Sequence, residues 1–280
     1  MRGAFLLQRH TKPKLNQKHT KHTLQPALPT ADSRLKQIVF RLMPALSLAG
    51  FLAVWQLLSL RYARFILPSP LDVVAKLVER LQDGTLLVHI AVTLSEALPG
   101  LLIGTALAFV VGYPVAKSRV ADRLLSPFII ASQGIPFVAI APLLFIWFGG
   151  GLVTIILICT LIVFFPIAIN VMTGVRNVPL LWHDLFSAAN ATPWQRFAKL
   201  ELPAALPFVF AGLRVGGTLS MIGAITGEFL SASDQGLGFL VNQGNGLYDT
   251  PLVMLAVVMI VGLALLIYGG IRLIERRLVG

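Results

Sequence analysis

The sequence predicts an all-α protein that crosses a membrane several times, and its composition is the first reason. Of the 280 residues, 56% are hydrophobic and only 12% are charged, and the mean hydropathy is +0.81. Two segments, 124–175 and 250–271, contain no Asp, Glu, Lys or Arg. They match two spans and one span, because about 20 apolar residues cross the hydrocarbon core. Lipid offers no hydrogen-bond partners to the backbone, so these segments must be helices.

The hydrophobic runs predict six transmembrane helices, and the charges in the loops predict their direction. We expect spans at about 42–60, 89–116, 125–147, 152–172, 204–229 and 250–271. If the N-terminus is inside, the inner segments hold 18 of the 23 Lys and Arg residues and the outer segments hold four. Cytoplasmic loops carry such an excess of positive charge. Both termini are therefore predicted to be cytoplasmic.

The N-terminal segment 1–40 differs in kind from the predicted six-helix membrane domain, residues 41–280. Nine Lys and Arg residues lie within residues 1–41, against Asp32 as the one acid. The segment has no helical periodicity, which predicts a disordered cytoplasmic tail. We expect its charge to hold the N-terminus inside and to contact anionic lipid, and we expect no nucleic-acid partner.

Small residues recur every fourth position in the second and fifth predicted spans, which predicts close helix contacts. The partner helices can belong to this chain or to another. The two stripes are Gly100, Gly104, Ala108 and Gly112, and Gly212, Gly216, Ser220 and Ala224.

The sequence offers no set of residues for catalysis, so no catalytic, cofactor-binding or metal-binding residue is predicted. Cys159 is the only cysteine, which excludes an internal disulfide and a site built of several thiolates. No Gly is followed by Lys, so the phosphate-binding P-loop pattern is absent. If ATP is used, another chain must bind it.

Four polar residues within the predicted spans are candidates for a translocation pathway. Ionisable groups inside a membrane are costly, so each of the two acids is first considered functional, and the two amides are uncharged polar candidates. For the acids the alternative is solvation or structural pairing at the outer interface, and for the amides it is interhelical hydrogen bonding. The candidates are Glu228, Glu96, Gln133 and Asn170.

The inner segment 173–203 predicts two short helices joined by a turn. Thr192 and Gln195 form a capping-box pattern around Pro193, which favours a helix start. That helix is predicted to stop near Glu201, because a residue before proline, here Leu202, avoids helical angles. A second helix is expected over 184–189.

The stretch N-A-T-P-W-Q-R-F-A-K-L-E-L-P-A-A-L-P, residues 190–207, resembles the cytoplasmic loop by which permease subunits of bacterial ABC importers dock on their ATPase. Further motifs, among them LPSPLDV (67–73), IPFVAIAPLLFIWFGGG (135–151) and GEFLSASDQGLG (227–238), resemble the nitrate/sulfonate/taurine-type permeases. That group includes permeases for riboflavin and for thiamine-precursor pyrimidines. The resemblance covers residue 40 to the end and implies the type I importer permease fold in the bacterial inner membrane.

The resemblance also implies which residues couple the permease to the ATPase. Asp184 stands at the group's acidic position and Asn190 at its glycine position, where Asn keeps the capacity for a left-handed turn. Glu96 stands where many relatives carry a basic residue. The implied coupling residues are Asp184, Asn190, Ala191, Thr192, Trp194, Phe197, Leu202 and Pro203.

The function implied is that of a permease for a small polar solute, with ATP and Mg bound by partner subunits. Its expected partners are a second permease copy, two ATPase subunits, an extracytoplasmic binding protein and membrane lipid. The substrate stays open among a thiamine-precursor pyrimidine, riboflavin, a sulfonate or taurine, and nitrate, although segment 230–249 has no basic cluster for an anion. A gradient-driven transporter or channel and a membrane scaffold are the alternatives.

Overall fold

A computed structural model describes the backbone of residues 31–231 and 233–279, and the side chains of 43–231 and 233–279. Most of the predicted basic tail, residues 1–30, lies outside this part of the chain. The chain divides into two compact units, residues 1–51 and 52–280. In the first, the described residues are the N-terminal part of helix α1, which begins at Ala31 and contains Pro44. The second unit holds every other element.

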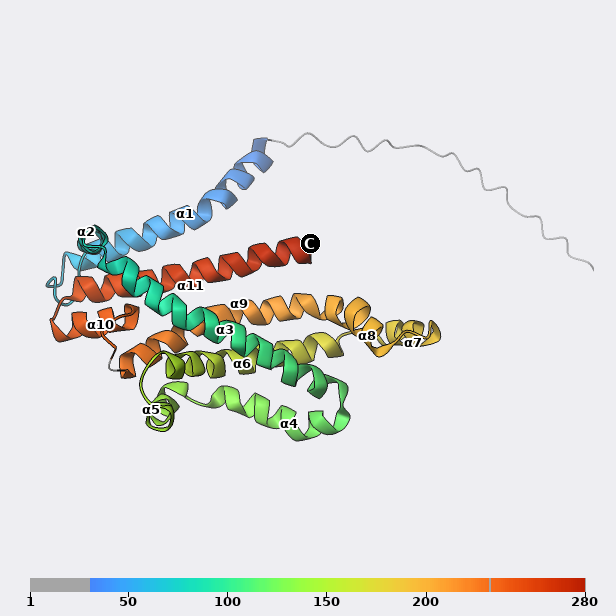
Figure 1. Ribbon diagram of the computed structural model, residues 1–280. Coiled ribbons are helices and arrows are strands. Elements are labelled where there is room, and N and C mark those ends of the chain that lie inside the picture. Colours follow the sequence, from blue (N-terminus) through green and yellow to red (C-terminus); the bar gives the residue numbers. More distant parts are fainter. Residues whose placement is uncertain (1–30, 232, 280) are drawn as a thin grey trace, which may run out of the picture. The chain divides into compact units, whose positions relative to one another are not determined.

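Every regular element of the described residues is helical (Figure 1). Some of the helices exceed 25 residues, whereas those near the chain's turns are short. In order they are α1 Ala31–Ser59, α2 Pro70–Gln82, α3 Thr85–Lys117, α4 Arg119–Ala131, η1 Ser132–Gly134, α5 Phe137–Phe148, α6 Leu152–Arg176, α7 Leu180–Ala188, α8 Pro193–Arg196, η2 Phe197–Glu201, α9 Leu202–Leu230, α10 Leu237–Gly246 and α11 Thr250–Leu278.

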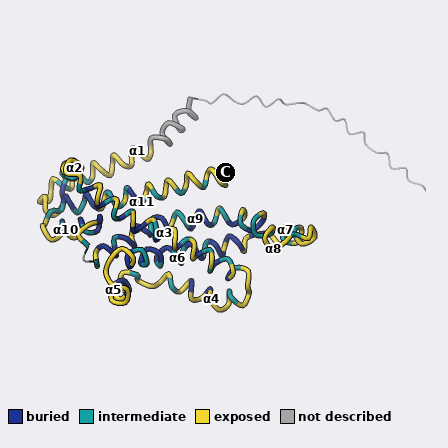
Figure 2. Tube along the Cα trace, in the orientation of Figure 1, coloured by how far each residue is buried: buried dark blue, intermediate teal, exposed yellow. Residues whose placement is uncertain are grey.

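Helix α6 packs closely against both α3 and α9, and these three helices carry most of the buried residues (Figure 2). The predicted stripes of small residues make both contacts. A Cβ added at Gly104 on α3 would lie 2.9 Å from the carbonyl oxygen of Thr160, and one at Gly212 on α9 would lie 2.9 Å from Cβ of Asn170. The stripes therefore meet a helix of the same chain, which the sequence left open.

The predicted third span, 125–147, is not one continuous helix but two, α4 and α5. Helices α4 and α5 are bent by 102° at the break between them. Pro136 has no N–H to donate, and Ile135 before it is extended, with ψ of 123°. The two helices form either a broken span or a re-entrant loop.

Four helices of the described residues are long and apolar enough to cross a membrane, and five if the bent pair is one span. Of α1, the part whose side chains are described, Met43–Ser59, is apolar but too short to be counted among these four. The all-α, multi-pass class is confirmed. The count of six spans and the cytoplasmic side of the termini stay predictions.

Two segments between the predicted spans, 61–88 and 230–249, contain helices that the span prediction missed. Helix α2 is amphipathic and begins at a capping box, in which the Ser69 N–H donates to the Asp72 carboxylate over 2.9 Å. Pro70 occupies the first helical position, where its missing N–H costs nothing. Short amphipathic helices of this kind are too polar to register as spans.

Candidate functional site

The segment 180–201, here called the coupling segment, comprises α7, α8 and η2 and protrudes from one end of the second unit (Figure 1). The predicted capping box is confirmed: Thr192 N–H donates to Gln195 Oε1 over 2.9 Å, and Gln195 N–H donates to Thr192 Oγ1 over 3.3 Å. Asn190 has φ of 52°, which confirms the predicted left-handed turn. The upstream helix is longer than the predicted 184–189.

The prediction that the helix stops before Pro203 is wrong. Leu202 is helical, with φ of −62° and ψ of −50°, and the chain passes from α8 through η2 into α9. η2 is a π-helical turn, which inserts an extra residue into the helical ladder. The widened turn lets the chain remain helical although Pro203 donates no hydrogen bond. The coupling segment is therefore continuous with the long helix α9.

Glu201 fastens the end of the coupling segment to the end of α3, and the sequence reading missed it. Its side chain is fully buried. It accepts a hydrogen bond from Tyr113 Oη over 2.6 Å and forms an ion pair with Lys117 Nζ. His183 on α7 has its Nδ1 4.0 Å from the same carboxylate. The signal was present as an acid among apolar residues, but only the fold brings Tyr113 and Lys117 to it.

The outer face of the coupling segment is apolar and exposed. Trp194 is 71% exposed and Trp182 is 50% exposed. The ring of Trp194 lies 5.4 Å from that of Phe197, which in turn packs edge-on against Tyr113 at 5.1 Å. A shallow hollow of about 320 Å³ lies between α7 and α8, and its lining is Leu185, Phe186, Ala189, Ala191, Gln195 and Lys199.

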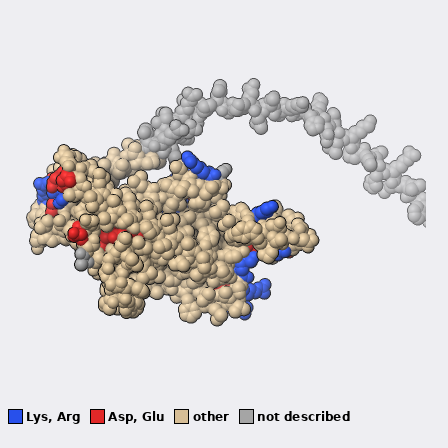
Figure 3. All heavy atoms as spheres, in the orientation of Figure 1, with Lys and Arg blue, Asp and Glu red and all other residues tan. Residues whose placement is uncertain are grey.

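Charge is unevenly placed on the face seen in Figure 3. Lys and Arg side chains stand around the end that carries the coupling segment, whereas the opposite end shows both basic and acidic side chains. Asp184, the predicted acidic contact, is exposed on α7. The structure thus places exposed aromatic rings, basic groups and the exposed Asp184 at the same end of the unit.

The predicted pathway acids lie together toward the other end, between α3 and α9. Glu96 and Glu228 are buried, and their side chains lie within hydrogen-bonding reach of each other. Thr93 Oγ1 donates to Glu228 Oε1 over 2.6 Å, and the N–H of Gly238 donates to Glu228 Oε2. The sequence indicated both acids as candidates, but it did not predict that they meet.

The two pathway amides lie apart from that pair. Gln133 is exposed in η1, at the break between α4 and α5. Asn170 donates to the carbonyl oxygen of Pro166 over 2.8 Å within α6, and it packs against Gly212 of α9. The structure therefore does not gather the four candidates into one site, and their pathway roles stay predictions.

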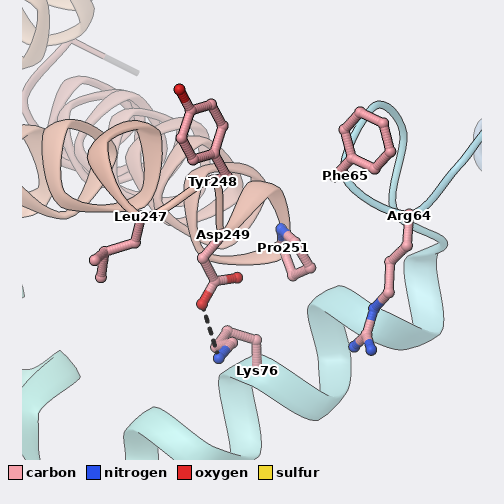
Figure 4. A pocket seen from close by; sticks show the side chains of 7 residues that line it. All are labelled: Arg64, Phe65, Lys76, Leu247, Tyr248, Asp249 and Pro251. Carbon is pink, nitrogen blue, oxygen red and sulfur yellow. Dashed lines mark ion pairs between the residues drawn. The ribbon is translucent and has the colours of Figure 1, made fainter.

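A hollow of about 460 Å³ lies at the end of the unit opposite the coupling segment, between α2 and the start of α11 (Figure 4). Its two basic side chains are paired with acids. Lys76 Nζ lies 3.0 Å from Asp249 Oδ2, and Arg64 lies 2.9 Å from Asp72. The Tyr248 ring points away from the Lys76 and Asp249 pair (Figure 4). The hollow therefore offers no free cluster of positive charge.

Asp72 is held in its ionised form at this end. The Ser69 N–H and then the Ser69 hydroxyl donate to the carboxylate and lower its pKa, burial opposes them, and the Arg64 charge lowers the pKa further.

No group of three His, Cys, Asp or Glu residues that could hold a metal ion occurs in the part of the chain described.

This chain is similar to known proteins over most of its length. The family model described as "Binding-protein-dependent transport system inner membrane component" matches residues 100–280. The riboflavin transport system permease protein RibX of Chloroflexus aurantiacus is 39% identical over 78% of this chain and 81% of its own length. The formylaminopyrimidine transport permease protein ThiX of Halalkalibacterium halodurans is 28% identical over 86% of this chain and 96% of its own. Other relatives are named as permeases for aliphatic sulfonates and for taurine.

A solved structure shows the same fold. The MetNI methionine ABC transporter in an inward-facing conformation matches with a TM-score of 0.55 and 24% identity, over 66% of this chain and 94% of that chain. At this identity the likeness shows the fold alone. The predicted type I importer permease fold is confirmed.

Proposed function

The chain belongs to the family of binding-protein-dependent transport system inner membrane components, and we propose that it forms the pathway by which an ATP-driven importer moves a small polar solute. It is a multi-pass protein of the bacterial inner membrane and a permease of the ABC-importer group that includes riboflavin, thiamine-precursor, sulfonate and taurine permeases. In the proposed assembly, a second permease copy completes the pathway, two ATPase subunits bind ATP and Mg, and an extracytoplasmic binding protein delivers the solute.

The shape of the coupling segment is the observation that carries the proposal. Exposed Trp194 and Trp182 and the hollow between α7 and α8 present apolar surface and a recess to one side. Exposed aromatic side chains beside a recess are typical anchors of protein interfaces. We infer that the ATPase docks here, with Asp184, Asn190, Ala191, Thr192, Trp194, Phe197, Leu202 and Pro203 as the coupling residues.

The connections of this segment explain how its movement would reach the membrane. η2 continues into α9 without a break, so a force on α8 acts along α9. Glu201 also ties the segment to α3 through Tyr113 and Lys117. Since α3 and α9 both pack on α6, a displacement of the coupling segment would move three helices of the unit together.

The break between α4 and α5 supports a pathway at this part of the chain. Non-helical backbone at membrane depth is tolerated where it is buried in protein or lines a water-filled cavity. Gln133 lies in that break and is exposed. We therefore keep Gln133 as the pathway candidate with the most direct structural support.

The substrate that we propose is a flavin or a related uncharged heterocycle. RibX is more similar to this chain than the sulfonate permease of Bacillus subtilis, with 39% against 27% identity. Both basic groups of the hollow in Figure 4 are neutralised by acids, so it gives no reason to expect an anionic solute.

A coupling assay with matched variants tests the proposal. The permease and the ATPase encoded with it are co-purified and reconstituted with the cognate binding protein, and riboflavin uptake and ATP hydrolysis are measured. Trp194→Ala is expected to reduce ATPase co-purification at least tenfold, since aromatic anchors of an interface typically contribute more than about 2 kcal/mol. Asp184→Lys, which reverses the charge, should also weaken the complex.

Phe65→Ala is the matched control, because Phe65 is similarly exposed at 65% but lies at the opposite end of the unit. It should leave ATPase binding unchanged. Normal co-purification of both coupling variants would overturn the docking site. Uptake that persists without ATP hydrolysis and collapses with an uncoupler would instead indicate a gradient-driven transporter.

A further inference from the structure

The Glu96 and Glu228 pair is unusual because two acids share one buried space. Glu96 on α3 is 3% exposed and Glu228 on α9 is 1% exposed. Their side chains lie within hydrogen-bonding reach of each other. Two ionised carboxylates in contact repel each other, and burial removes the water that would screen them.

Among the residues whose side chains are described, no positive side chain pairs with either acid. None of the ion pairs formed by side chains in the described ranges includes Glu96 or Glu228. The titratable and charged groups that surround the site are Cys159 on α6, His89 on α3 and, around His89, Arg80 and Asp83 near α2 and Asp234 in the segment after α9.

The two acids differ in the donors that reach them. Both oxygens of Glu228 accept hydrogen bonds, one from the Thr93 hydroxyl over 2.6 Å and one from the N–H of Gly238. Such donors favour the ionised form of a carboxyl group. In contrast, no donor of the described residues reaches Glu96 Oε2, although this atom is buried. An ionised Glu96 would thus be a buried charge without a partner.

We propose that Glu96 binds a proton at neutral pH and donates it in a hydrogen bond to ionised Glu228, so that the pair is a proton-binding site with one negative charge. The proton supplies the donor that is otherwise missing between the two oxygens. A carboxylic acid that donates to a carboxylate forms a short, charge-assisted hydrogen bond. This assignment does not depend on the proposed transport function.

The site fastens the short segment 236–238, at the start of α10, onto α3. Three successive N–H groups of this segment donate to side chains at the site: Gly236 to His89 Nδ1 over 3.0 Å, Leu237 to Thr93 Oγ1 over 2.9 Å, and Gly238 to Glu228. Loss of the proton would place a second charge against Glu228. The repulsion would separate α3 from α9 at this point and release the segment.

Infrared difference spectroscopy of the full chain in detergent tests the protonation directly. The spectrum of the wild type at neutral pH minus that of Glu96→Gln should contain the C=O stretch of a protonated carboxylic acid. Glu79→Gln is the control, because Glu79 is exposed, and its difference spectrum should lack this band. If Glu96→Gln does not fold, the same band should disappear from the wild type alone between neutral and alkaline pH.

Hydrogen exchange tests the fastening. At one alkaline pH, the amides of Gly236, Leu237 and Gly238 should exchange at least tenfold faster in the wild type than in Glu96→Gln. The glutamine keeps a donor toward Glu228 but cannot ionise. Intrinsic exchange rates are the same in both proteins at one pH, so the ratio reports the structure.

Two results would overturn the proposal. One is a wild type without the protonated carboxyl band at neutral pH. The other is a melting temperature of the wild type that is higher in sodium or potassium chloride than in the chloride salt of a bulky organic cation, with no such difference in Glu96→Gln. That result would show that a metal cation, and not a proton, occupies the site. Equal exchange in the wild type and Glu96→Gln at alkaline pH would disprove the fastening.

Discussion

Replacement of Glu201 is the sharpest test of the link between the coupling segment and α3. Glu201→Ala removes the acceptor of the Tyr113 hydroxyl and the partner of Lys117. A hydrogen bond to a charged group contributes about 1.5–3 kcal/mol. The ion pair adds about 1 kcal/mol or less, because Lys117 is 44% exposed and solvent screens it. The expected loss of unfolding free energy is therefore about 3 kcal/mol.

Thermal unfolding in mild detergent measures this loss. A change of about 3 kcal/mol should lower Tm by roughly 6–12 °C in a chain of this size. Glu201→Gln keeps an amide oxygen for Tyr113 and loses only the charge, so it should cost about 1 kcal/mol. The exposed Glu79→Ala, whose carboxylate pairs with Lys76 at the surface, should change Tm little.

A double-mutant cycle and a transport assay complete the test. Lys117→Met combined with Glu201→Gln should show a coupling energy of about 0.5–1 kcal/mol. In the reconstituted importer, Glu201→Ala should hydrolyse ATP but transport less solute per ATP. A Tm within about 1 °C of the wild type, corresponding to less than about 0.5 kcal/mol, together with unchanged transport, would refute the role given to Glu201.

Two further predictions concern packing and pH. Gly223→Ala should destabilise the protein by about 1–3 kcal/mol, because its Cβ would lie 2.8 Å from Cα of Cys159. Gly262→Ala is the control, because a Cβ there meets no atom within 4 Å, and it should not destabilise the protein. Unfolding in detergent compares the two variants, and equal stabilities would contradict the contact. The pKa of Asp72 is lowered in the fold, so its contribution to α2 is complete above the ordinary aspartate value of about 3.9 and is lost as the pH falls through the lowered pKa. Amide exchange of α2, normalised for pH, should thus rise in acid for the wild type and be nearly constant for Asp72→Asn; equal acid responses would argue against this cap.

Local features of the candidate site could be predicted from sequence because they depend on neighbouring residues. The capping box at Thr192 needs only a hydroxyl, a proline and an amide at fixed spacing, and the turn at Asn190 needs only a residue that tolerates positive φ. The small-residue stripes could also be predicted, because residues spaced four apart lie on one face of a helix. The helical class follows from the hydropathy of the runs, because lipid leaves the backbone no alternative.

The local rule for residues that precede proline did not hold everywhere, because the packing of the flanking helices overrides it. The rule that a residue before proline leaves the helix predicted a stop at Leu202, yet η2 carries the chain through Pro203 into α9. At Ile135 and Pro136 the same rule applies, and there the chain does break. A local steric preference cannot distinguish the two cases, because a wider helical turn can relieve the clash where the flanking helices are held by packing.

The sequence by itself determined that this is an all-α, multi-pass membrane protein, that a capped helix begins after Thr192, and which family the chain belongs to. Hydropathy, capping and motif spacing are local properties, so they can be read along the chain. Only the tertiary structure decided that Glu201 binds Tyr113 and Lys117, that α6 receives both small-residue stripes, and that Glu96 meets Glu228. Each of these depends on residues far apart in the chain, and the free energy of a buried polar group is set by the partner that packing brings to it.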